Sequence, residues 1–84
     1  MTHYAIFPRD TAGAMLQHIT QASDEDAAFE DFTDIVGAHA DRHAFAIIEI
    51  TPDQRAEIEE WHDNGAPADE APEWLDEAIH RASA

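Results

Sequence analysis

The residues best suited to chemistry are histidines and acids that stand close together in two short stretches of the chain. His39, Asp41 and His43 alternate, so in an extended segment their side chains point the same way. In a helix, His39 and His43 would again share a face. Imidazole nitrogen and carboxylate oxygen both bind zinc, but a fourth ligand would have to come from elsewhere, with His3 as one candidate. A polar loop before a strand explains the same residues, and we predict neither a metal nor a cofactor.

The second stretch, Glu59, Glu60, His62 and Asp63, has residue types that serve general acid–base catalysis. On a helix, however, Glu59 and His62 fall at the borders of the buried face, outside any recognisable pocket. The chain also has no cysteine, no glycine-rich phosphate loop and no pair of carboxylates set apart in apolar surroundings. We therefore expect that the protein is not an enzyme.

The acids are more informative as a group, because they far outnumber the basic residues. The 84 residues include 19 acids and 4 bases, all of them arginine, for a formal net charge of -15. From Asp10 to Asp41 there are eight acids and neither arginine nor lysine. Nucleic acids and anionic membranes bind positive surfaces, so we expect no direct binding to either.

The acids of one predicted helix form a stripe along its outer face. With Phe32 at the centre of the buried face, Asp26, Glu30 and Asp34 fall on the opposite side, roughly 6 Å apart along the axis. Like charges at this spacing destabilise a helix by roughly 0.2–0.5 kcal/mol per pair. A sequence selected for stability alone would interleave basic residues, so the stripe indicates another purpose.

An array of unpaired anions at regular spacing imitates the phosphates of a nucleic acid. We therefore predict a small acidic inhibitor that binds the nucleic-acid-binding surface of a basic host protein or complex, of the anti-CRISPR or anti-restriction type. Such a protein would be of viral origin, for example from a phage, and would act in the host cytoplasm. The alternative is a salt-adapted, halophilic housekeeping or adaptor domain with no inhibitory role. The predicted partner-binding residues are Asp24, Glu25, Asp26, Glu30, Asp31, Asp34, Glu73 and Glu77.

A short strand and two helices are predicted before residue 38. His3–Phe7 is typical of a strand, which Pro8 ends. Asp10 or Thr11 can cap a first helix. The i, i+3, i+4, i+7 spacing predicts that its inward face consists of Ala12, Met15, Leu16 and Ile19.

The second predicted helix carries the acid stripe. Ser23 with Asp26 resembles a capping box, and Gly37 is a natural C-terminal stop. The predicted buried residues of this helix are Ala28, Phe29, Phe32, Ile35 and Val36.

A second strand and two more helices are predicted in the rest of the chain. Residues 44–50 are aromatic and β-branched, which favours a strand. Residues 51–54 (Thr-Pro-Asp-Gln) form a helix start, with Ile58 and Trp61 facing inward. Pro72 opens a last helix. Its predicted apolar stripe is Trp74, Leu75, Ala78, Ile79 and Ala82.

These elements predict one small α+β domain over residues 1–84, in the order β-α-α-β-α-α. Two short strands would be covered on one face by about four helices, and the helical crossover is long enough for parallel pairing. A free strand edge would leave room for a homodimer. No apolar run approaches the length of a membrane span, so we expect a cytoplasmic protein.

Overall fold

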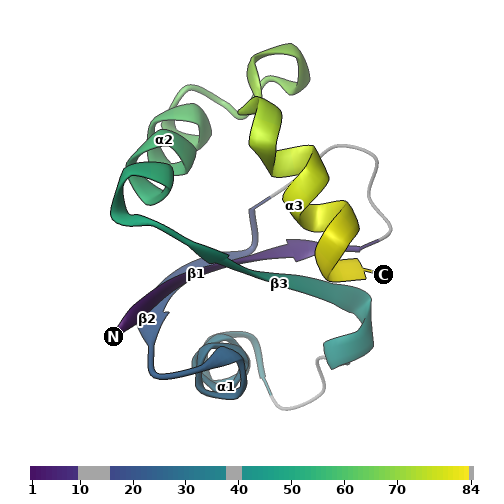
Figure 1. The fold of residues 1–84 in the computed structure, drawn as a ribbon. Coiled ribbons are helices and arrows are strands. Elements are labelled where there is room, and N and C mark those ends of the chain that lie inside the picture. Colours follow the sequence, from purple (N-terminus) through teal and green to yellow (C-terminus); the bar gives the residue numbers. More distant parts are fainter. Residues whose placement is uncertain (10–15, 38–40, 84) are drawn as a thin grey trace.

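The described part of the chain is a three-stranded sheet with helices on both of its faces (Figure 1). This computed structural model describes residues 1–9, 16–37 and 41–83. Within them the element order is β-β-α-β-α-α, with two additional short 3-10 helices. The small α+β class is confirmed, whereas the predicted count of two strands and four helices is wrong.

β1 (Thr2–Pro8) lies in the middle of the sheet. It pairs antiparallel with β2 (His18–Ala22) on one side and with β3 (Phe45–Ile50) on the other. The parallel pairing allowed for the two predicted strands is therefore wrong. The strands that do run parallel are β2 and β3, which are separated by β1 and joined through the helix α1 (Glu25–Val36).

The central strand is buried on both faces, which explains its nearly continuous apolar sequence. Ala5 and Phe7 point into a core with α2 (Pro52–Asp63) and α3 (Glu73–Ser83). The alternate residues of β1 point into a second core with α1. The prediction that all helices cover one face is wrong, because each side of the sheet needs its own apolar cover.

The two cores differ in size. The larger one consists of Ala5, Phe7, Ile48, Ile50, Ile58, Trp61 and Leu75. The smaller one consists of Tyr4, Ile6, Ala22, Ala28, Phe32 and Ile47. The predicted inward positions Ile58, Trp61 and Leu75 are thus confirmed as buried.

The first predicted helix is wrong where it can be compared with the structure. Residues 10–15 lie outside the described residues, and His18–Ala22 is the strand β2. Ile19 satisfied the helical spacing, but it packs against the larger core from an extended strand. Because a helix and a strand both place Ile19 on an apolar face, periodicity alone misassigned this segment.

The N-cap of α1 and the burial of its last turn differ from the prediction. Asp24, rather than Ser23, is the N-cap, and its carboxylate accepts a hydrogen bond from the backbone N–H of Ala27 at 2.8 Å. At the other end Ile35 and Val36 are 68% and 55% exposed, because the described core of this layer ends one turn earlier. Phe29 is half-buried. Three residues predicted to be buried on this helix are therefore more exposed than predicted: Phe29, Ile35 and Val36.

The residues predicted to end α1, to start α2 and to start α3 are confirmed in those roles. Gly37 ends α1 with a positive φ of 102°, a conformation that glycine adopts without strain. Thr51 and Gln54 form the predicted capping box at the start of α2. Pro72 immediately precedes α3.

Candidate protein-binding surface

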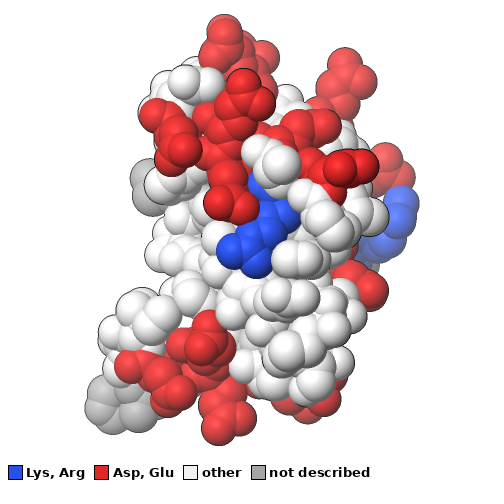
Figure 2. Space-filling view, turned by 90° about the vertical axis from the view of Figure 1, so that its left-hand side faces the viewer, with Lys and Arg blue, Asp and Glu red and all other residues white. Residues whose placement is uncertain are grey.

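The predicted binding residues lie on two opposite sides of the sheet. Six of them belong to α1 or its N-cap, and all six are exposed. Glu73 and Glu77 are exposed on α3, beyond the other face. In Figure 2 the acidic side chains accordingly gather in an upper and a lower group, with a mostly uncharged band between them. The structure therefore does not bring the eight residues together into one patch.

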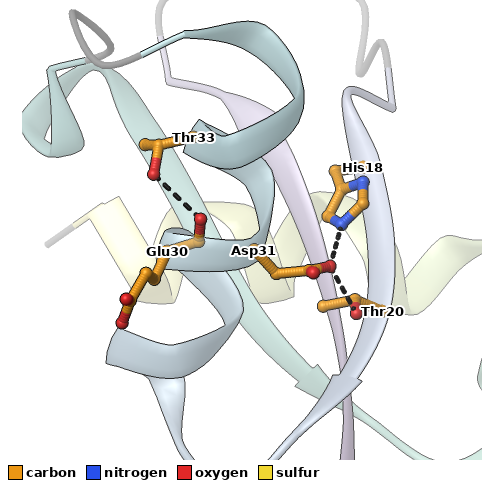
Figure 3. Close-up of polar contacts among 5 residues, drawn as sticks. All are labelled: His18, Thr20, Glu30, Asp31 and Thr33. Atoms are coloured by element: carbon orange, nitrogen blue, oxygen red, sulfur yellow. Dashed lines mark hydrogen bonds and ion pairs between the residues drawn. The ribbon is translucent and has the colours of Figure 1, made fainter.

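Asp31 connects α1 to the edge strand β2 (Figure 3). Its Oδ2 accepts hydrogen bonds from His18 Nε2 at 2.8 Å and from Thr20 Oγ1 at 2.9 Å. The hydrogen bonds from His18 and, second, from Thr20 hold the pKa of Asp31 below its usual value. Asp31 is thus an ionised anchor between two elements, whose carboxylate is half-exposed to solvent.

Arg42 supplies the counter-charge that the sequence of α1 lacks. It belongs to the short 3-10 helix η1 (Arg42–Ala44), and its guanidinium binds Asp26 and lies 3.6 Å from a carboxylate oxygen of Glu25. The same guanidinium lies 6.0 Å from the ring centre of Phe29. The expectation of acids without intrahelical counter-ions holds, but the pairing comes from outside the helix.

The remaining acids of this helix leave a narrower open stripe. Asp24 is occupied as the N-cap. Among the described residues, Glu30 and Asp34 have no hydrogen bond or ion pair to their carboxylates. Figure 3 shows the Glu30 side chain pointing away from β2. Glu30 and Asp34 are one helical turn apart and are, among the acids of α1, the carboxylates most available to a partner.

The acids at the start of α1 act on the phenol of Tyr4. Burial, followed by the nearby charges of Glu49, Glu25 and Asp24, raises the pKa of the Tyr4 hydroxyl. Tyr4 faces the α1 core from the central strand. Burial and these neighbouring carboxylates thus both disfavour the ionised form of Tyr4.

A second acidic surface covers the opposite side of the sheet. Two of its acids are paired within their own helices: Glu59 with Arg55 at 2.9 Å, and Glu77 with Arg81 at 2.6 Å. Most acids of this surface were not among the predicted binding residues, although they contribute to the same excess of acids over bases. Its exposed members are Asp53, Glu57, Glu59, Glu60, Asp63, Asp69, Glu70, Glu73, Asp76 and Glu77.

The two tryptophans belong to this second side. Trp61 is buried, as predicted, and its indole N–H donates to the Pro67 carbonyl at 2.8 Å. Trp74 is half-buried, and its N–H donates to Glu57 at 2.7 Å. Trp61 also lines a shallow cavity of about 300 Å³. The Trp74 ring packs against the larger core, while its N–H keeps the hydrogen bond to Glu57 at the surface.

The residues considered for catalysis or metal binding have other roles or lie apart. Glu59 is bound to Arg55, which also donates to His3 Nδ1 at 3.0 Å. His39 lies outside the described residues, and Asp41 caps η1 by accepting from the backbone N–H of His43. Within residues 1–9, 16–37 and 41–83, no three His, Asp or Glu side chains are grouped closely enough to hold a metal ion.

Comparisons with models of protein families, with curated proteins and with solved structures found no match to this chain. No helix in the described part of the chain is both long and apolar enough to span a membrane. The function must therefore be inferred from the surface alone.

Proposed function

We propose that this protein is a small acidic inhibitor that binds the nucleic-acid-binding surface of a host defence protein or complex, in place of nucleic acid. The observation that carries the proposal is the state of the carboxylates on α1. All six predicted acids of that helix and its cap are exposed, and Glu30 and Asp34 have no described counter-ion. A basic partner could therefore pair with them without first breaking internal ion pairs.

The contacts made by the neighbouring acids support this proposal. Asp31 is held by β2 and Asp26 by η1, so α1 is fixed to two other elements of the fold. Fixing the helix before binding reduces the entropy lost when the partner docks. The open carboxylates then present a rigid spacing, as the phosphates of a duplex do.

The chemistry of the partner follows from this surface. Arginine is the best match, because its planar guanidinium can bind a carboxylate through two parallel hydrogen bonds. The net charge of -15 would also accelerate the encounter with a basic surface. Because both contributions are electrostatic, the affinity should fall as salt is added.

A displacement assay tests the proposal directly. A fluorescent DNA duplex is bound to purified CRISPR effector complexes and restriction enzymes, and this protein is titrated in while the anisotropy is followed. Loss of the bound-duplex signal in at least one complex, reversed by added salt, is expected. In the control titration without a complex, the duplex signal should not change, since the protein is too acidic to bind DNA. Failure to displace the duplex from any complex would count against the inhibitor.

The halophilic alternative predicts a different response of the fold itself. A salt-adapted domain should unfold in dilute buffer and refold in molar salt, because salt screens the repulsion among its acids. An inhibitor acting in an ordinary cytoplasm should be fully folded near physiological ionic strength. Thermal melts followed by circular dichroism at low, physiological and molar salt distinguish the two.

A further inference from the structure

The backbone of β3 leaves one side unpaired among the described residues. The N–H of Arg9 donates to the Ala44 carbonyl at 2.9 Å, in the same register as the pair Phe7 and Ala46. Antiparallel ladders alternate, so residues 44, 46, 48 and 50 direct their N–H and C=O groups toward β1. Phe45, Ile47 and Glu49 direct theirs outward, and no described strand pairs with them.

A groove runs along this outer edge. One cavity of about 270 Å³ and another of about 220 Å³ share Glu25, Ile47 and Ala82 as lining residues, so they adjoin along β3. The α3 side of the groove is formed by the small side chains of Ala78 and Ala82 together with Arg81, which is paired with Glu77 on its own helix. Small residues at this position leave space for another backbone to approach the strand edge.

The charge along the groove changes sign from one end to the other. The cavity at the start of β3 is lined by Arg9, Arg42 and His43, with Phe45 and Glu25 beside them. Arg42 is already paired with Glu25 and Asp26, so Arg9 is the arginine here without a described ion pair. The cavity toward the end of β3 is lined by Glu49, which has no described ion pair, and by Arg81, whose guanidinium is paired with Glu77. Arg9 and Glu49, neither of which has a described ion pair, therefore lie toward opposite ends of an open strand edge.

We propose that β3 pairs antiparallel with β3 of a second copy, so that two three-stranded sheets join into one. Pairing centred on Ile47 of both copies places Glu49 of each copy opposite Phe45 of the other, next to the basic end of the groove. Such an edge is complementary to itself, as a two-fold symmetric interface requires. The charge complementarity favours a second copy over an unrelated strand, which would have to match both ends of the groove.

The dimer and the proposed inhibitor respond to salt in opposite ways. Two copies of a chain with net charge -15 repel each other at long range. Physiological salt screens charges beyond about 8 Å, while the contacts at the strand edge are closer than that. Moderate salt should therefore strengthen the dimer, whereas it weakens binding to a basic partner.

Charge exchange at the two ends of the groove tests the pairing. The dimer dissociation constant of the full chain is measured by sedimentation equilibrium and multi-angle light scattering. Glu49→Arg and Arg9→Glu should each raise the dimer dissociation constant about tenfold. Each change places like charges next to each other at both of the symmetry-related ends of the interface. The double variant should restore it. Glu60→Arg, an equal charge change on α2, serves as the control and should leave it near the wild-type value.

Amide hydrogen exchange gives a second readout that needs no variant. Ala46 and Ile48 should be protected at every protein concentration, because their N–H groups bind β1 inside one chain. Phe45, Ile47 and Glu49 should become protected only as the concentration rises. A chain that stays monomeric up to about 1 mM, or a dimer whose Ile47 amide still exchanges freely, would overturn the proposal.

Discussion

The two sides of the sheet differ in how their acids are held. On the α1 side the anchors come from other elements: His18 and Thr20 from β2, and Arg42 from η1. On the α2 and α3 side the two ion pairs are i, i+4 contacts within single helices. Pairs of the second kind contribute only about 0.3–0.5 kcal/mol and fix no helix to its neighbours. The α1 side has the smaller core, but two of its acids, Asp26 and Asp31, are held by side chains of other elements. Among the described acids of the opposite side, Glu57 is held in this way, by Trp74 of α3.

The largest expected effect is the loss of an apolar anchor from either side. Phe32→Ala should destabilise the protein by about 3–5 kcal/mol, since it opens a cavity and removes the edge-to-face contact with Phe45 at 5.0 Å. Ile58→Ala on the opposite side should cost about 2–5 kcal/mol. Urea unfolding followed by circular dichroism measures both. A cost below about 1 kcal/mol for Phe32→Ala would mean that α1 does not depend on this core.

The helix caps should give an intermediate effect. Asp24→Ala and Thr51→Ala each remove an acceptor for an N-terminal N–H group, so each should cost about 1 kcal/mol in the free energy of unfolding. Asp24→Asn keeps the acceptor and should cost much less, which separates capping from charge. Equal losses for the alanine and asparagine variants would instead assign the role of Asp24 to its charge.

The smallest effect is the acid sensitivity conferred by Asp31. Its pKa is lowered in the folded state, so its contribution is complete above its unfolded pKa and disappears as pH falls through the folded value. Asp31→Asn should therefore be less stable than wild type at neutral pH. The difference should begin to shrink below about pH 4 and vanish once Asp31 is protonated in the folded state. Urea midpoints at a series of pH values measure this. Asp34→Asn, which alters a carboxylate without a described partner, should follow the wild-type curve.

The elements with strong local signals could be predicted, but their arrangement could not. The capping box at Thr51, the stop at Gly37 and the inward Ile58 and Trp61 follow from neighbouring residues alone. The strand that contains Ile19 could not be assigned in this way, because an apolar residue fits a helix stripe and a strand face equally well. The strand β2 is defined by its pairing with β1, which joins residues such as Ile6 and His18 that are not neighbours in sequence.

The acids of the candidate surface were found from composition and helical spacing, but their pairing was not. Nothing in the local sequence shows that Arg42 folds back onto the start of α1, or that Asp31 meets His18 across the layer boundary. These contacts depend on how α1 lies on the sheet. They reduce the open stripe to Glu30 and Asp34, which is a smaller target than the eight residues predicted.

The central claim is that α1, and not the overall charge, binds the partner. Its most direct test compares two double charge reversals that change the net charge equally: Glu30→Lys with Asp34→Lys on α1, and Glu60→Lys with Asp63→Lys on α2. Both variants are first checked for an unchanged circular dichroism spectrum and then titrated against a complex that the wild type releases from DNA. The α1 variant should bind about a hundredfold more weakly and the α2 variant within about threefold of wild type. Equal losses in the two variants would contradict the claim and leave only a general charge effect.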